Sequence, residues 1–309
     1  MTLALELIGG LIVLTLGAEL LVRGASALAL RLGMTPLVVG LTVIAFGTSA
    51  PELVVSAMAA QRGSAAIAVG NVIGSNLCNL ALILGLCALL RPLTASHRVI
   101  RREIPLLIGA TAFSCLLLLN RELGRGEGII LLACLIGLTI ATLREARTDS
   151  DQTYDHRPAK LPRLPTAIAQ TIAGFVLLLF GSDLFVDGAV AVARQLGWSE
   201  KLIGLSIVAI GTSLPELATS MVAVAKGEND VALGNVVGSS LFNALGILGV
   251  TGVFGGAVVP ELAYLDLVIL LGVTVAILPL VKSGGRITRL EGAGLFAVYV
   301  AYLAWAIYA

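Results

Sequence analysis

Little in this sequence could cover a water-exposed surface or build a reactive centre. Charged residues make up 13% of the 309 positions and aromatic residues 5%, and there are two histidines. A soluble domain carries about 25% charged residues, so the chain is not an ordinary soluble protein. The net charge of +1 indicates no nucleic-acid partner. With no C-x-x-C spacing, the cysteines are predicted to be small buried side chains, not ligands or bridges: Cys78, Cys87, Cys115 and Cys134.

Hydrophobic residues, by contrast, occupy 58% of the chain, and the mean hydropathy is +1.00. Ten apolar segments approach or exceed the roughly 20 residues that a helix needs to cross a bilayer. The predicted fold class is therefore an all-α polytopic membrane protein with ten transmembrane helices. No basic region precedes the first segment, so we expect no cleaved signal peptide. The segments cover residues 3–31, 35–61, 64–90, 101–120, 127–144, 166–195, 200–226, 229–255, 261–281 and 289–308.

One strongly polar stretch, residues 144–165, separates five segments from five. We expect a first repeat at residues 1–145, a linker at 146–165 and a second repeat at 166–309. The repeats match without a gap at a constant offset, the 164 residues that separate Glu52 from Glu216. Such self-similarity indicates an internal duplication. Other matched pairs are Gly40 and Gly204, Ser75 and Ser239, and Asn79 and Asn243.

Five crossings per repeat is an odd number, so the second copy enters the membrane from the opposite side and the repeats are inverted. Cytoplasmic loops carry an excess of Lys and Arg. The loops on the cytosolic side carry more Lys and Arg than the loops outside when both termini lie outside and the linker lies in the cytosol. The predicted location is the cell inner (plasma) membrane, with multiple passes through the bilayer.

A polar hexapeptide interrupts an apolar segment in each repeat. It reads GTSAPE at 47–52 and GTSLPE at 211–216. A carboxylate at bilayer depth costs about 2.5–3.5 kcal/mol on insertion scales, so Glu52 and Glu216 need partners in a protein interior or cavity. No Lys or Arg lies in either flanking apolar stretch. The expected partner is a cation that binds and leaves.

Each hexapeptide is also predicted to break its helix. Pro51 and Pro215 lack the N–H that a helix requires, and each disfavours helical geometry at the residue before it. Gly47 and Gly211 tolerate unusual backbone angles. Irregular backbone in a membrane is tolerated where it is buried or lines a cavity, and broken helices in matching halves indicate a transport site. Carbonyl groups are expected to lose their helical partners around Ala45, Phe46, Ala209 and Ile210.

The segments that follow supply more oxygen atoms. Ser75 and Asn79 lie one helical turn apart, as do their matches Ser239 and Asn243. Thr48 and Thr212 precede the two glutamates at the same spacing. All of these ligands are oxygens, which disfavours soft metals and suits Ca²⁺ and Na⁺. The local chemistry leaves Ca²⁺, Na⁺ and H⁺ open as transported ions.

Several other polar residues have a less definite role. Interhelical hydrogen bonding and ion binding are equally compatible with Ser49, Ser213, Ser56, Ser220, Asn71 and Asn235. Glu19 and Arg23, four residues apart, are expected to pair. Asp183 and Asp187 have no such partner and are expected near an aqueous vestibule.

These motifs carry a family resemblance over essentially the whole chain. The stretches GLTVIAFGTSAPELVVS with GNVIGSNLCN, and GLSIVAIGTSLPELATS with GNVVGSSLFN, resemble the calcium/cation antiporter superfamily and its prokaryotic sodium/calcium exchangers. The resemblance implies ten helices in two inverted halves, with broken helices 2 and 7 at the ion site. It implies exchange of about three Na⁺ for one Ca²⁺ by alternating access, with the first and sixth helices sliding past a rigid core.

The resemblance also implies roles for individual residues. Glu52 and Glu216 would coordinate Ca²⁺, helped by backbone near Thr48 and Thr212. The implied Na⁺ ligands are Ala45, Thr48, Ser49, Glu52, Ser75, Asn79, Ala209, Thr212, Ser213, Glu216, Ser239 and Asn243. No cofactor is implied besides the transported ions, and we expect a functional monomer.

One position departs from part of the family. The potassium-dependent branch has Asp where Asn243 stands, which argues against K⁺ cotransport and leaves Na⁺-linked and H⁺-linked exchange open. A cation channel is a weaker alternative, because channels are usually rings around a symmetry axis. An enzyme is not expected, because both histidines lie in predicted loops and a motif serine would lack its usual base.

Overall fold

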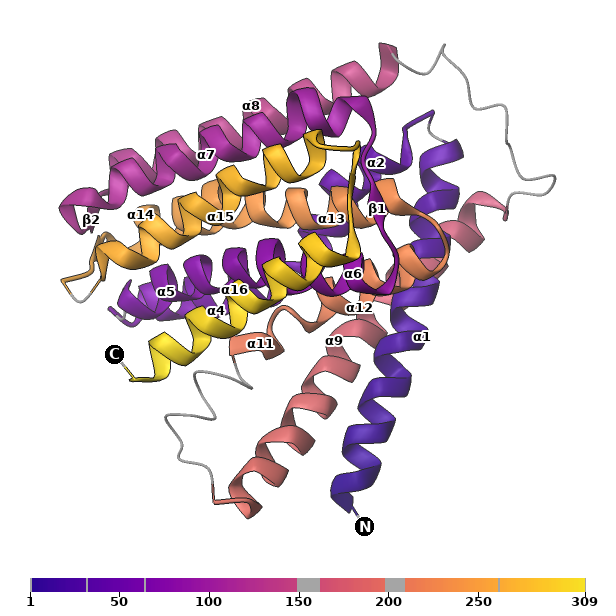
Figure 1. Ribbon diagram of the computed structural model, residues 1–309, viewed down its shortest axis with the longest axis horizontal. Helices are drawn as coiled ribbons and strands as arrows, with labels where there is room; N and C mark the ends of the chain where they lie inside the picture. The colour runs from indigo at the N-terminus through magenta and orange to yellow at the C-terminus, as the bar shows by residue number, and fades with distance from the viewer. Residues whose placement is uncertain are drawn as a thin grey trace.

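A computed structural model describes residues 2–31, 33–63, 65–148, 162–197, 209–260 and 262–308 (Figure 1). The protein is almost entirely helical. Most of the predicted linker, residues 149–161, lies outside the described residues, as does the first part of the seventh predicted segment, residues 200–208.

The first half consists of helices of very different length, joined by short π-helical or 3₁₀ (η) pieces and two two-residue strands. They are α1 (Thr2–Arg31), α2 (Pro36–Val39), η1 (Gly40–Ile44), α3 (Ala45–Thr48), α4 (Ala50–Gln61), α5 (Ala65–Leu77), η2 (Cys78–Ile83), α6 (Leu84–Leu90), β1 (Leu93–Thr94), η3 (Val99–Glu103), α7 (Ile104–Leu117), the 3₁₀ turn η4 (Leu118–Asn120), β2 (Glu122–Leu123) and α8 (Arg125–Thr148).

The second half follows a similar order, but its described residues contain no counterpart of η3 or η4. Its elements are α9 (Leu164–Gln195), α11 (Ala209–Gly211), α12 (Leu214–Ala225), α13 (Asn229–Leu241), η7 (Phe242–Ile247), α14 (Leu248–Gly255), β3 (Ala257–Val258), α15 (Tyr264–Lys282), β4 (Arg286–Ile287) and α16 (Arg289–Tyr308).

Seven described helices are long and apolar enough to cross a membrane, or eight if the bent pair Pro36–Thr48 and Ala50–Gln61 is one span. This count bears out a polytopic helical membrane protein and falls short of the ten predicted spans. One reason is that α12 has 12 residues, because the predicted seventh segment begins outside the described part of the chain.

α1 and α9 pack on each other along most of their length and diverge from the other helices in Figure 1. Glycines let the two backbones touch. A Cβ on Gly17 would lie 2.7 Å from the backbone nitrogen of Leu178, and a Cβ on Gly24 would lie 2.6 Å from that of Thr171. As the residue number of the contact rises along α1, it falls along α9, so the two helices run antiparallel.

The two halves are also joined by short strand pairs. β1 pairs with β4 and β2 pairs with β3, both antiparallel. Each pair therefore links one half to the other. Between them, α13 is buried from Val231 to Leu241, and its polar side chains lie inside the protein rather than against lipid.

The cysteine prediction is correct for three residues and wrong for the fourth. Cys78, Cys87 and Cys115 are buried, but Cys134 is exposed. It lies on α8, which also exposes Ile129, Ile130 and Ile136. An apolar residue on a membrane helix can face lipid as well as a protein core, and hydropathy alone does not separate the two.

Candidate functional site

Both hexapeptides interrupt their helices as predicted. In the first half α3 ends at Thr48, α4 starts at Ala50, and the axis bends by 47° between them. In the second half α11 ends at Gly211 and α12 starts at Leu214. Pro51 and Pro215 lie in the first turn of the new helix, where the missing N–H costs nothing.

The predicted loss of carbonyl partners is wrong at two positions. The backbone N–H of Ser49 donates to the Ala45 carbonyl at 3.0 Å, and that of Ser213 donates to the Ile210 carbonyl at 3.0 Å. The bond to Ala45 is an ordinary helical one that proline does not touch, and the bond to Ile210 closes a tighter turn of three residues. The carbonyl that Pro215 leaves open is that of Gly211, which accepts from Ser182 Oγ at 2.9 Å. The backbone near each motif therefore has fewer open carbonyls than the sequence suggested.

The two glutamates are held across the boundary between the halves. Ser49 Oγ donates to Glu216 Oε1 at 2.8 Å, and Ser213 Oγ donates to Glu52 Oε1 at 3.0 Å. Glu52 is 1% exposed and Glu216 is fully buried. The serine of each motif thus holds the carboxylate of the other, which brings both acidic side chains to one place.

Several buried polar atoms beside these bonds have no hydrogen-bond partner among the described residues. Each glutamate has one oxygen of this kind, and the remaining ones belong to predicted ligands. Burying such atoms unpaired is costly, and a cation would satisfy the oxygens. They are Glu52 Oε2, Glu216 Oε2, Ser75 Oγ, Thr212 Oγ1, Asn79 Oδ1 and Asn243 Oδ1.

Asn79 and Asn243 lie in matching π-helical segments. η2 holds Asn79 and packs against α12, the helix of Glu216. η7 holds Asn243 and packs against α4, the helix of Glu52. Single-turn π segments are frequent at functional sites. No propensity signal in the sequence separates them from an ordinary helix.

A second layer of amides supports the broken helices. Asn71 Nδ2 donates to Ser56 Oγ at 2.9 Å and to the Glu52 carbonyl. Asn235 Nδ2 makes the matching bonds to Ser220 Oγ, at 3.0 Å, and to the Glu216 carbonyl. These serine–asparagine pairs therefore act as interhelical supports.

The remaining predicted ligands lie on the same elements. Thr48 is fully buried and its hydroxyl lies 3.2 Å from Asn235 Oδ1. Ser239 Oγ donates to Glu216 Oε1 at 3.4 Å. Ala45 starts α3 and is buried, and Ala209 starts α11. The structure also joins the halves through Asn76, whose amide donates to the Ser240 carbonyl at 3.3 Å; sequence reasoning did not single out Asn76.

A cavity of about 590 Å³ adjoins this cluster on one side. Its wall includes Pro51 and Thr212 from the two motifs, and Asp183 and Asp187 from α9. Both aspartates are exposed, one helical turn apart. The prediction that they lie near a vestibule agrees with this placement.

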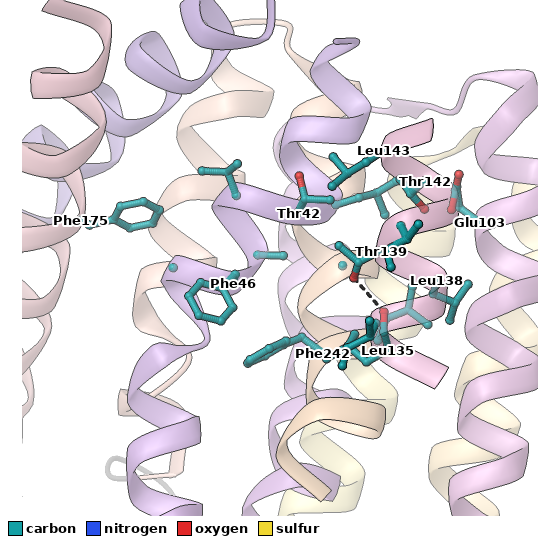
Figure 2. A pocket seen from close by; sticks show the side chains of 18 residues that line it. Thr42, Phe46, Glu103, Leu135, Leu138, Thr139, Thr142, Leu143, Phe175 and Phe242 are labelled. Carbon is teal, nitrogen blue, oxygen red and sulfur yellow. Dashed lines mark hydrogen bonds between the residues drawn. The ribbon is translucent and has the colours of Figure 1, made fainter. Parts of the chain in front are cut away.

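An apolar cavity of about 710 Å³ lies beside the first broken helix (Figure 2). Phe46, Phe175 and Phe242 line it, together with α8 side chains such as Leu135 and Leu138. Glu103 contributes to its wall, but this carboxylate pairs with Arg98 and Arg102. With so few polar groups, this cavity is a poor path for ions.

Comparisons with known proteins agree on one kind of protein. A family model described as sodium/calcium exchanger protein matches residues 2–144 and 166–308. Inner membrane protein YrbG of Escherichia coli is 38% identical over 97% of this chain and 96% of its own. Sodium/calcium exchanger MaX1 of Methanosarcina acetivorans is 30% identical over 97% of each chain. The solved sodium-calcium exchanger NCX_Mj, soaked with Na⁺ and Sr²⁺, superposes with a TM-score of 0.84, 29% identity and 98% coverage of both chains.

Proposed function

Because the chain belongs to the sodium/calcium exchanger protein family, we propose that it exchanges Na⁺ for Ca²⁺ by alternating access. It is an ion transporter rather than an enzyme, and its family exchanges these ions without a cofactor. The observation that supports the proposal is the pair of buried glutamates, each with one oxygen held by the other half and one oxygen without a partner.

Glu52 and Glu216 are the proposed Ca²⁺ ligands, with help from Thr48 and Thr212. Two carboxylates neutralise one divalent ion, and Ca²⁺ accepts six to eight oxygens in flexible geometry. The proposed Na⁺ sites use the same glutamates with neighbouring hydroxyls, amides and carbonyls, which are supplied by Ala45, Thr48, Ser49, Ser75, Asn79, Ala209, Thr212, Ser213, Ser239 and Asn243.

Coupling follows from overlap of these positions. One Ca²⁺ or several Na⁺ can neutralise the two carboxylates, but the ligands cannot serve both at once. An empty site would leave two buried negative charges unpaired, which is costly. Each change of access must then carry cargo. About three Na⁺ per Ca²⁺ would move net charge, and the membrane potential would contribute about 2.3 kcal/mol per charge per 100 mV.

The proposed architecture has ten helices in two inverted repeats, broken at helices 2 and 7. The antiparallel packing of α1 on α9, its match in the repeat, supports the inversion. Helix α12 would be the end of the seventh span. Both termini are proposed to lie on the outer side of the inner membrane, and the linker in the cytosol. The monomer is the proposed functional unit.

The test is ⁴⁵Ca²⁺ uptake into proteoliposomes loaded with Na⁺, K⁺ or protons. An outward Na⁺ gradient should drive uptake, and the K⁺ gradient should not. Glu52→Gln and Glu216→Gln should each abolish uptake, because an amide keeps the shape and removes the charge.

A matched control is Glu122→Gln, which removes an exposed carboxylate on β2 and should leave uptake unchanged. Uptake driven by a proton gradient alone would assign the chain to H⁺-coupled exchange instead. Uptake that survives in both glutamate variants would refute the proposed site.

A further inference from the structure

One ion pair connects α1 to a helix of the ion site. Lys226 Nζ lies 3.3 Å from Glu19 Oε1, and Glu19 also pairs with Arg23 on its own helix. Lys226 is the C-cap of α12, and Glu216 lies in the first turn of that helix. The pair therefore links the α1/α9 unit directly to the helix that carries one of the two buried glutamates.

The repeat supplies a second pair of residues in the matching positions. The offset that relates Glu52 to Glu216 also relates Glu19 to Asp183 and Arg62 to Lys226. Arg62 is the C-cap of α4, and Glu52 lies in the first turn of that helix. An acidic residue on the α1/α9 unit and a basic residue at the end of a motif helix thus occur in both halves.

The two matching pairs differ in state. Glu19 and Lys226 are joined, whereas Asp183 is exposed on the cavity wall and makes no ion pair with any described residue. The acidic members also lie at different levels. The contact between Gly17 and Leu178 serves as the reference level along the antiparallel helices α1 and α9. Glu19 lies on the side of this level toward the Gly24–Thr171 contact, and Asp183 lies on the opposite side.

The cavity also lies on one side of the Gly17–Leu178 contact. Its α9 wall runs from Leu179 to Asp187, so the cavity is on the Asp183 side of this contact. The joined pair is on the opposite side. The cavity that reaches the motif residues Pro51 and Thr212 thus lies on the side where the ion pair is absent.

We propose that Glu19–Lys226 and Asp183–Arg62 are alternating latches, of which only one is formed at a time. The Glu19–Lys226 pair holds the protein closed on the side away from the cavity. When the α1/α9 unit moves and the cavity closes, that pair breaks and Asp183 meets Arg62. These four are positioning residues, and the inference rests on the alternating access proposed above.

The physical chemistry suits such a role. Rigid movement of one bundle against another is the usual form of alternating access in inverted repeats. A partly exposed ion pair is weak, so it can bias two states without locking either. Glu19 and Lys226 side chains are 36% and 28% exposed, which is in this range.

The test measures how often the cavity is open, using a thiol on its wall. Val54 lines the cavity and is 56% exposed. Val54→Cys is made in a Cys134→Ala background, because Cys134 is exposed. Purified protein in detergent micelles is labelled with a charged maleimide, so the reagent reaches both faces and only opening of the cavity limits the rate.

Lys226→Gln should lower the labelling rate roughly two- to five-fold, because it releases the latch of the cavity-open state. Arg62→Gln should raise the rate by a similar factor, because it removes the latch of the opposite state. Lys226→Arg keeps the charge and should label like the parent protein.

Asp183→Asn and Asp187→Asn form a matched comparison. Both remove one carboxylate from the same wall, so their electrostatic effect on the reagent is alike. The repeat relates Asp187 to Arg23, which is basic. Asp187 therefore has no acidic counterpart in an ion pair and is not a proposed latch residue. Asp183→Asn should therefore label faster than Asp187→Asn.

Opposite shifts for Lys226→Gln and Arg62→Gln support the latches. Shifts in the same direction, or unchanged rates in both variants, overturn them. The assay contains no ion gradient, so failure of Na⁺-driven uptake would refute the proposed coupling while leaving the labelling result to decide the latches separately.

Discussion

The two halves carry the same polar motif residues, but these residues make different numbers of hydrogen bonds. Glu216 Oε1 accepts from Ser49 and also from Ser239. Glu52 Oε1 accepts from Ser213, while Ser75, the match of Ser239, has no partner among the described residues.

The threonines differ in the same direction. Thr48 lies within hydrogen-bond distance of the Ile44 carbonyl and of Asn235, whereas Thr212 Oγ1 has no hydrogen-bond partner within the described ranges. Thr212 also lines the cavity. Thr212 therefore combines an unpartnered hydroxyl with a place on the cavity wall, whereas the hydroxyl of Thr48 is held inside the protein.

The largest expected effect is at the glutamates and would test whether the halves are equivalent. Glu52→Gln and Glu216→Gln should each reduce ⁴⁵Ca²⁺ uptake at least about 100-fold, because removing one charged partner of a buried pair costs about 3–5 kcal/mol. A large loss in one variant and a small loss in the other would show that only one carboxylate binds the ion.

The next effect is at the serines that bridge the halves. Ser49→Ala and Ser213→Ala each remove a hydrogen bond to a carboxylate, a contribution of about 1.5–3 kcal/mol. Each should raise the Ca²⁺ concentration for half-maximal uptake roughly 10-fold. Isothermal titration of the purified variants with Ca²⁺ gives an independent measure, and Cys134→Ala serves as a control without effect.

A smaller effect should separate the two halves. Ser75→Ala removes an unpartnered hydroxyl on α5, which packs against the helix of Glu52, so only ion binding should be lost. Ser239→Ala removes a long bond to Glu216. Na⁺ affinity, measured by Na⁺ inhibition of ⁴⁵Ca²⁺ binding, should fall about three-fold in each, but only Ser239→Ala should also lower the melting temperature of the ion-free protein. A loss of stability in Ser75→Ala would contradict the assignment.

The smallest effect on transport is expected at the supporting amides. Asn235 is fully buried and Asn71 is partly buried. Asn235→Ala should destabilise the protein by about 1–3 kcal/mol, and Asn71→Ala by less. Thermal unfolding in detergent measures this difference, while uptake per folded molecule should change little. A lost uptake with unchanged stability would instead make the asparagine an ion ligand.

Much of the site could be predicted from the chain because its signals are local. Glu52 and Glu216 are costly at membrane depth, and a proline within a long apolar segment favours a break in the helix before it. The Glu19–Arg23 pair was predictable from its spacing of four residues, and the structure confirms it. The ion-ligand roles stay predictions for the experiments above.

Other features depend on neighbours that are distant in the chain. The Ile210 carbonyl keeps a partner because the chain closes a turn of three residues there, and the exposure of Cys134 depends on how α8 packs. Lys226 meets Glu19 only through tertiary packing. None of these contacts has a local pattern, so sequence reasoning missed them or predicted them wrongly.

A duplicated membrane protein with a buried, oxygen-rich acidic motif in each copy could be predicted from the amino-acid sequence alone. Hydropathy, register and the cost of a buried charge are properties of the chain and need no coordinates. The folded chain was needed to show that each serine holds the glutamate of the other half. It was also needed to show that Lys226 pairs with Glu19 while a cavity lies beside Asp183. The matching motifs do not encode these contacts, because they form between residues that are distant in the chain.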